Sequence, residues 1–187
     1  MKFEKTRLDG VLSITPQVYG DARGNFFETW QVKKYADAGI ALPFLQDNVS
    51  RSIKGVLRGL HFQNPNAQAK LVSVLFGSVF DVAVDVRQNS PQFGEWYGEI
   101  LSSENSKQLW IPQGFAHGFY VTSDFAVFAY KCTEFYDPKS EVSLLWNDPK
   151  IGVSWPEGEK IISAKDSIGL RLAELPTIKL TFNQGLN

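Results

Sequence analysis

The chain has 187 residues, 43% of them hydrophobic, which is enough to bury the core of one compact domain. Nineteen basic and twenty acidic residues give a net charge of −1, so bulk charge favours neither nucleic acid nor an anionic membrane as a partner. The charged start, MKFEKTR, has no signal-peptide core, and no stretch approaches the roughly 18 apolar residues of a membrane span. We therefore expect a cytoplasmic protein. Cys132, the only cysteine, excludes an internal disulfide and is expected to be a small buried hydrophobe.

The predicted elements are mostly short β-strands. Aromatic residues make up 13% of the chain and accompany short Val/Ile runs that Gly, Pro, Asn and Asp interrupt, a composition that favours strands. In chain order, the predicted strands cover residues 11–18, 25–29, 45–49, 56–63, 71–76, 79–87, 96–101, 108–111, 118–121 and 126–135. Their spacing predicts a mainly β fold, a sandwich or jelly roll with a few short helices.

Two segments have helical features. Residues 30–38 form one clear helical pattern, and Gly39 follows it as a C-terminal stop. Residues 163–166 begin a short helix or form a structured loop. We expect a single domain over residues 1–187, with a jelly-roll core at about 45–136 between N-terminal strands with a helix and a C-terminal loop and helix segment.

A Gly-Ser pair separates the predicted strands 71–76 and 79–87, and such a pair is typical of a two-residue hairpin turn. In the second of these strands, apolar residues at positions 80, 82, 84 and 86 alternate with Asp81 and Asp85. Successive side chains of a strand point to opposite faces. One face should therefore pack in the core, and the other should meet a polar environment.

The only two histidines, His61 and His117, lie in dense motifs, RGLHFQ and IPQGFAHGF, that otherwise resemble β-strand. Because both of the chain's histidines lie in such motifs, we expect them to belong to one active site. Histidine titrates near neutral pH, so His61 can act as a general base that removes a proton from a carbon next to a carbonyl. A carboxylate would have to orient its ring, and the residues alone do not choose among the aspartates. A structural histidine is the alternative interpretation.

A bound metal is a competing interpretation for a small β-sandwich with histidines in its strands. A histidine-rich site of the cupin type needs about three imidazoles and a carboxylate. Here two histidines with Glu28 or Glu141 could at most form a facial triad. We therefore expect no metal.

Three basic residues, Arg23, Arg58 and Lys70, stand close to glycine or small residues that let a ligand approach the backbone. Arginine suits phosphate oxygens, and a lysine ammonium can also neutralise an enolate, although each residue alone is more often a surface charge. Arg58 and His61 would face opposite sides of a regular strand. A bulge at Gly59 would turn both side chains toward one pocket.

Tyr130 shares a predicted strand face with Phe128 and Cys132. Such a tyrosine packs in the core by default, with its hydroxyl at the rim. If the hydroxyl points into a pocket, Tyr130 is a candidate proton donor.

Eight segments in one order resemble the dTDP-4-dehydrorhamnose 3,5-epimerase family. The clearest are VLRGLHFQ at 56–63 and QLWIPQGFAHGF at 108–119, and the others are GDARG with Glu28, QDN, FDVAVD, YKCT, LWND and SAKD. The resemblance covers nearly the whole chain. It implies a cupin-like, double-stranded β jelly roll without metal or other cofactor, usually a homodimer, that acts in the route to dTDP-L-rhamnose.

The resemblance also implies roles for individual residues. His61 is similar to the proton-abstracting base, Asp166 to its paired aspartate, Tyr130 to the proton donor, and Lys70 to the lysine that stabilises the enolate. Further contacts with the substrate are implied for Arg23, Glu28, Gln46, Asp47, Asn48, Arg58, His117, Glu141 and Lys165.

The implied reaction inverts C3 and C5 of dTDP-4-dehydro-6-deoxy-D-glucose. In the substrate's chair both hydrogens are axial on one face, so one base can reach either carbon and form an enolate each time. Alternatives are an epimerase that inverts only C3 or only C5 of a related dTDP-4-keto-deoxysugar, a non-catalytic cupin that binds nucleotide sugars, and a metal-dependent cupin dioxygenase.

Overall fold

The computed structural model describes residues 1–178. In chain order the strands are β1 (Lys2–Lys5), β2 (Leu12–Thr15), β3 (Val18–Asp21), β4 (Gly24–Phe27), β5 (Gln46–Ile53), β6 (Leu57–Gln63), β7 (Lys70–Phe76), β8 (Ser78–Asp85), β9 (Trp96–Ser102), β10 (Gln108–Ile111), β11 (Phe115–Val121), β12 (Phe125–Cys132) and β13 (Glu141–Ser143). The helices are α1 (Val32–Asp37), α2 (Ala164–Ser167) and the short 3-10 helix η1 (Leu172–Glu174).

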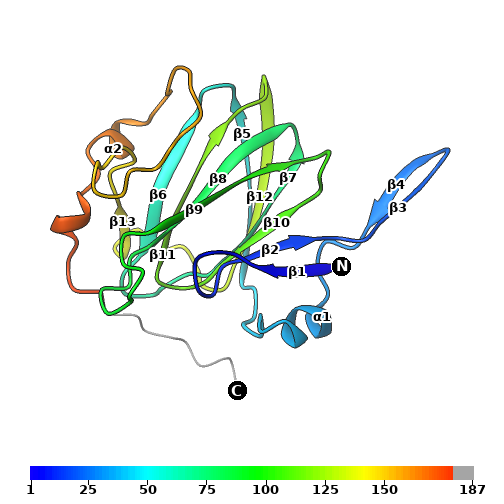
Figure 1. Ribbon diagram of the computed structural model, residues 1–187, viewed down its shortest axis with the longest axis horizontal. Helices are drawn as coiled ribbons and strands as arrows, with labels where there is room; N and C mark the ends of the chain where they lie inside the picture. Colours follow the sequence, from blue (N-terminus) through cyan, green and yellow to red (C-terminus); the bar gives the residue numbers. More distant parts are fainter. Residues whose placement is uncertain (179–187) are drawn as a thin grey trace.

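Two antiparallel sheets face each other as a jelly-roll sandwich (Figure 1). One has six strands in the order β1-β2-β10-β7-β12-β5, and the other has five in the order β13-β6-β11-β8-β9. The predicted fold class, mainly β with a few short helices, is confirmed. Strands β1, β2 and β13 extend the sheets although they lie outside the predicted core range of 45–136. Within residues 1–178, no helix has the length and apolar character needed to cross a bilayer.

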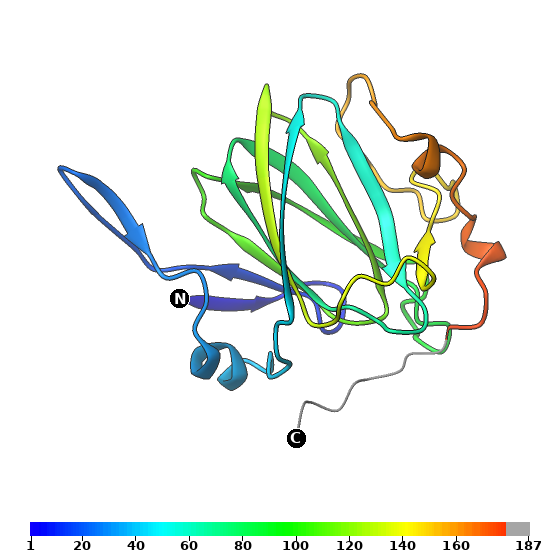
Figure 2. The same ribbon diagram turned by 180° about the vertical axis from the view of Figure 1, so that it is seen from behind.

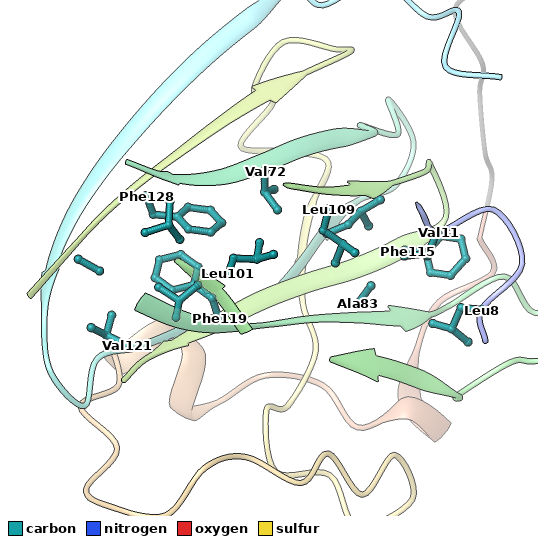
Figure 3. Packing of buried hydrophobic residues seen from close by; sticks show 14 residues of the cluster. Leu8, Val11, Val72, Ala83, Leu101, Leu109, Phe115, Phe119, Val121 and Phe128 are labelled. Atoms are coloured by element: carbon teal, nitrogen blue, oxygen red, sulfur yellow. The ribbon is translucent and has the colours of Figure 1, made fainter. Parts of the chain in front are cut away.

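The main hydrophobic core lies between the sheets. Its large side chains include Phe115 and Phe119 from β11, Phe128 from β12 and Leu109 from β10, all nearly inaccessible to solvent (Figure 3). Burial of this apolar area, at about 25 cal/mol per Å², is the main term that holds the sheets together. Because the cluster occupies only part of the space between the sheets, the rest is left for a cavity.

Both faces of strand β8 are buried, and the polar environment predicted for the second face lies inside the protein, where Asp81 is bonded to His117. Val82 and Val84 pack in a second core cluster with Leu144 and Ile151, beneath the C-terminal segment. The opposite face carries the buried Asp81 toward the space between the sheets. The aspartates that alternate with apolar residues in β8 therefore indicate a polar site inside the protein.

The predicted hairpin at Gly77 is wrong. Strand β7 pairs with β10 and β12, whereas β8 pairs with β9 and β11, so the chain passes from one sheet to the other at this glycine. Gly77 has φ +77°, and a Cβ atom there would collide with the carbonyl oxygen of Phe125. The glycine is thus required for a tight crossover between sheets, not for a hairpin turn.

The N-terminal part forms an edge of the fold and a projecting hairpin. Strand β1, which was not predicted, adds to β2 at the edge of the six-stranded sheet. Strands β3 and β4 form a separate two-stranded ribbon that extends away from the sandwich (Figures 1 and 2). The helix predicted at 30–38 is confirmed as α1, which Gln31 caps through a bond from the Lys34 amide.

The C-terminal segment returns to the five-stranded sheet. Isolated parallel bridges join Val56 to Ile161 and Leu144 to Leu170. Helix α2 then begins at Ala164, with the Ser163 side chain accepting a hydrogen bond from the Asp166 amide. Of the two alternatives for residues 163–166, a short helix and a structured loop, the structure forms the helix, which brings Asp166 next to β6, with which α2 is in contact.

Candidate active site

A β-bulge in β6 turns Arg58 and His61 toward one cavity, as the sequence predicts. His61 pairs with His117 of β11, but the register shifts before Arg58, so two residues of β6 lie opposite one residue of β11. Gly59 has φ +115°, and a Cβ atom there would lie 2.6 Å from the Gly118 Cα. Only glycine fits this position, and the bulge places both side chains on the cavity wall.

The cavity has two connected parts between the sheets. The larger, of about 490 Å³, is lined by residues that include Arg58, His61, Lys70, His117, Phe119, Phe128, Tyr130, Lys165 and Asp166. The smaller, of about 360 Å³, shares His61, Lys70 and Tyr130 with the first and is otherwise mostly polar, with Gln46, Asn48, Gln63, Gln68, Cys132, Tyr136 and Glu141 among its lining residues. Cavities of several hundred Å³ are typical of small-ligand sites.

His61 and Asp166 form a hydrogen-bonded pair, with 2.6 Å between His61 Nε2 and Asp166 Oδ1. Asp166 is 3% exposed, and its carboxylate also accepts a bond from the Gly59 amide. Burial raises the pKa of Asp166, but the hydrogen bond and charge of His61, the Gly59 amide and the Ser163 hydroxyl lower the pKa by more, so the carboxylate stays ionised. An ionised acceptor holds the proton on Nε2, which leaves Nδ1 of His61 free to accept one.

A second histidine–aspartate pair lies on the same sheet. His117 Nε2 is 2.9 Å from Asp81 Oδ2, and both side chains are buried. Burial lowers the pKa of His117 even though the Asp81 charge opposes this shift, so the imidazole is neutral at neutral pH. The ring also stacks on Phe128 at 5.9 Å. His117 is therefore held in one orientation at the cavity wall.

Lys70 and Tyr130 reach the cavity from the six-stranded sheet, opposite His61. Among the residues that the structure describes, neither the Lys70 ammonium nor the Tyr130 hydroxyl has a hydrogen-bond partner, so both are available to a ligand. Burial lowers the pKa of Lys70, and nearby Cys132, Asp81 and Glu141 offset part of that shift. Burial raises the pKa of Tyr130, which keeps its hydroxyl protonated. Tyr130 can thus donate a proton into the cavity.

The polar part of the cavity includes Tyr136, a residue that the sequence did not reveal. Its hydroxyl donates to Glu141 Oε2 at 2.6 Å, and Glu141 also forms an ion pair with Lys165. Burial raises the pKa of Glu141, but the bonds from Lys165 and Tyr136, together with the charges of His61 and Lys165, lower it by more. Tyr136 lies in the loop after β12, where no strand periodicity indicates which way a side chain points. Gln63, by contrast, could have been found from its position two residues after His61.

Gln46 and Asn48 line the polar part of the cavity and are bonded to each other at 3.0 Å. Cys132 is buried there, as expected, and accepts a bond from Asn48. Asp47 lies between them in β5 and points to the opposite face, where it pairs with Lys131 at 2.8 Å. The structure therefore does not bring Asp47 into this cavity.

Arg23 and Glu28 also lie away from the cavity of their own chain. Arg23 sits at the tip of the β3–β4 hairpin and pairs with Asp21 at 2.5 Å, and Glu28 pairs with Lys34 at 2.8 Å. Two members of the hypothetical facial triad, His61 and Glu28, are thus separated. Across residues 1–178, no group of three or more His, Cys, Asp and Glu side chains is arranged to hold a metal ion.

Comparisons with known proteins place this geometry in a family. The family model described as dTDP-4-dehydrorhamnose 3,5-epimerase matches residues 5–174. A Salmonella typhimurium protein of that name is 53% identical over 166 residues, which cover 87% of this chain and 91% of the relative. A dTDP-4-dehydrorhamnose 3-epimerase from Streptomyces niveus is 38% identical over 176 residues, which cover 93% of this chain and 85% of the relative.

A solved structure has the same fold. The crystal structure of dTDP-6-deoxy-D-glucose-3,5-epimerase from Legionella pneumophila, in complex with dTDP-4-keto-L-rhamnose, has a TM-score of 0.93 and 50% identity, and the match covers 97% of this chain and 98% of that one. That protein, like the relatives above, is an isomerase of a nucleotide-linked sugar. Because the family model spans most of the chain and the sequence identities are high over almost its full length, this chain belongs to the dTDP-4-dehydrorhamnose 3,5-epimerase family.

Proposed function

We propose that this protein inverts C3 and C5 of dTDP-4-dehydro-6-deoxy-D-glucose to give dTDP-4-dehydro-L-rhamnose, in the route to dTDP-L-rhamnose. One observation carries the proposal. The aspartate-bonded His61 and the protonated Tyr130 project into one cavity from opposite sheets, and beside them lies Lys70, whose ammonium has no hydrogen-bond partner within residues 1–178. A base and an acid on opposite walls are what inversion at a carbon requires.

The reaction proceeds by proton transfers alone. His61 removes the axial proton from C3, the C–H electron pair moves into the C3–C4 bond, and the carbonyl oxygen O4 becomes an enolate. The Lys70 ammonium stabilises this charge, and Tyr130 delivers a proton to the opposite face of C3. The imidazolium and the tyrosinate then exchange protons with solvent, and the same steps repeat at C5. Because no electron is gained or lost, we propose that the reaction needs no cofactor.

The cations around the cavity suit the diphosphate of the substrate. Arg58 is exposed at the wall and donates from Nε to Ser52 Oγ at 3.2 Å, which leaves its terminal nitrogens for phosphate oxygens. Lys165 lies on the same wall. Gln46, Asn48 and Glu141 offer polar contacts to the rest of the nucleotide sugar.

We propose that the enzyme is a homodimer in the cytoplasm. Arg23 and Glu28 resemble substrate contacts, yet neither lines the chain's own cavity, and they lie on or beside a hairpin that projects away from the sandwich (Figure 2). The hairpin also exposes Tyr19 and Phe26, at 65% and 72%. A hairpin reaching the cavity of a second copy would cover these rings and bring Arg23 to bound substrate. The balanced charge and the single cysteine support a cytoplasmic location.

The decisive experiment follows solvent deuterium. The protein is incubated with dTDP-4-dehydro-6-deoxy-D-glucose in D₂O, and the label at C3 and C5 is counted by NMR and mass. Label at both carbons, with dTDP-L-rhamnose formed after a coupled reductase is added, is the expected result. Tight binding without any label would instead indicate a non-catalytic module.

Epimerisation at one carbon is the second candidate, because a 3-epimerase is 38% identical to this chain. Such an enzyme would use the same base and acid, so the side chains alone do not separate the two reactions. Label confined to C3 would replace the proposed double inversion by a single one.

A further inference from the structure

Two phenylalanines close one end of the cavity. Phe119 on β11 and Phe128 on β12 project from opposite sheets, and their rings stack at 4.2 Å with an angle of 21° between planes (Figure 3). They are 4% and 1% exposed, respectively. The pair thus ends the hydrophobic core and forms an apolar floor to the larger part of the cavity.

This floor adjoins the reacting groups. The Phe128 ring lies 5.9 Å from the His117 ring and 5.9 Å from the Tyr130 ring. In the proposed reaction Tyr130 donates to C3 and to C5 in turn, so it stands at the border of both parts of the cavity, and a sugar substituent on its apolar side meets the aromatic pair. On the other side of Tyr130 the cavity is polar, with Gln46, Asn48 and Glu141 in its walls.

The proposed substrate has the matching asymmetry. Its C4 carbonyl lies between C3, which bears a hydroxyl, and C5, which bears a methyl group, the only apolar substituent of the sugar. His61, Lys70 and Tyr130 belong to both parts of the cavity, so the carbonyl lies at their junction. Burial then favours the C3 hydroxyl in the polar part and the methyl group against the rings.

We propose that Phe119 and Phe128 form the subsite for the C6 methyl group and determine the preference of the enzyme for 6-deoxy sugars. This inference rests on the proposed function. A hydroxyl on C6 would enter an apolar site without a partner and lose its hydration. A hydrophobic pocket of this kind discriminates against an added hydroxyl by at most about 100-fold.

The test compares two unreactive ligands, dTDP-6-deoxy-D-glucose and dTDP-D-glucose, which differ only in the C6 hydroxyl. Neither has a ketone, so titration calorimetry measures binding without turnover. We expect the 6-deoxy ligand to bind the wild-type protein about 10- to 100-fold more tightly. Equal affinities would overturn the inference. This comparison needs no substitution and stands whether or not the variants below fold.

In the variant Phe119→Ala, the 6-deoxy ligand should bind no more than about threefold more tightly than dTDP-D-glucose, because water can then solvate the C6 hydroxyl. The matched control is Phe115→Ala, which removes the same ring from the same strand and core cluster. Phe115 does not line the cavity, and its ring lies under the Arg87 guanidinium. The control should retain the wild-type ratio. A ratio retained in Phe119→Ala, or lost equally in Phe115→Ala, would contradict the assignment.

The deuterium-labelling experiment distinguishes a failure of the methyl subsite from a failure of the proposed function. Equal binding of both ligands by a protein that exchanges label at C3 and C5 would remove only the methyl subsite. If neither nucleotide sugar binds and no label appears, the proposed substrate is wrong and the subsite falls with it. Preferential binding of the 6-deoxy ligand without exchange would keep the subsite and reject the catalytic proposal.

Discussion

The hydrogen bond that His61 Nε2 donates to the Asp166 carboxylate fixes which ring nitrogen is free to take a proton. In Asp166→Asn the imidazolium loses its charge partner, and a carboxylate no longer fixes which ring nitrogen carries the proton. We expect kcat to fall by about 10² to 10⁴, with little change in the affinity for dTDP-6-deoxy-D-glucose. A coupled reductase assay and calorimetry measure the two quantities. Asp124→Asn, which alters an exposed carboxylate paired with Lys54, is the control and should retain full activity.

Asp166 also links stability to pH. Its pKa is lower in the folded protein than in the unfolded chain, so its stabilising contribution is fully present above the unfolded pKa of about 3.9. The contribution is lost as the pH falls through the folded pKa. The difference in unfolding free energy between wild type and Asp166→Asn should therefore shrink below about pH 4. Urea unfolding at pH 7 and pH 3 tests this, and a constant difference would argue against an ionised Asp166.

The Tyr130 hydroxyl is predicted to protonate the face of the sugar opposite His61. In Tyr130→Phe the ring still packs, but the enolate can regain a proton only from the His61 side or from water. We expect product formation to fall by about 10² or more while deuterium exchange at C3 continues without inversion. NMR of the recovered substrate distinguishes this outcome from simple loss of binding. Inversion at the wild-type rate would exclude Tyr130 as the acid.

At the scale of elements, the bulge in β6 depends on Gly59. In Gly59→Ala the new Cβ would meet the backbone of Gly118 at 2.6 Å in a left-handed conformation. We expect a loss of about 1–3 kcal/mol in unfolding free energy, and a fall in kcat because Arg58 and His61 no longer share one wall. Urea unfolding and the coupled assay measure both.

Gly39→Ala is the matched control for the bulge. Gly39 has φ +90°, but apart from Gly39 and its two chain neighbours no residue of 1–178 has an atom within 4 Å of the point that a Cβ would occupy, so the substitution adds conformational strain without a collision. It should lower stability only slightly and leave kcat unchanged. If both variants lose the same stability and neither loses activity, the bulge does not organise the site.

Local sequence signals predicted β2, the strands from β4 to β12, α1 and the β6 bulge because each depends on neighbouring residues, whereas β1, β3 and β13 were not predicted. The hairpin at Gly77 was wrong because a tight turn indicates where a chain reverses or crosses but not which strand it joins. Strand β1 was missed because it gains its partners only at a sheet edge. The pairing of His61 with Asp166, 105 residues apart, came from family resemblance and not from spacing.

At the scale of the whole molecule, the homodimer proposal predicts complementation. His61→Asn and Arg23→Ala should each be poorly active alone, since one lacks the base and the other a contact with substrate. In a mixed dimer, the intact hairpin of the first variant reaches the intact cavity of the second. An equal mixture that exchanges subunits should therefore recover about a quarter of wild-type activity. No recovery, or a monomeric mass by light scattering, would contradict the shared site.

The docking of the C-terminal segment on β6 has a consequence for biosynthesis. The ribosome delivers His61, Lys70 and Tyr130 well before Asp166, and the strands of both sheets end at Ser143. A nascent jelly roll can thus assemble while its general base still lacks the carboxylate that orients it. Catalytic competence arises only when residues 164–167 have emerged and settled beside the bulge, so synthesis cut short before α2 would leave His61 without its carboxylate and β8 without the Leu172 and Leu175 side chains that help to cover its outer face.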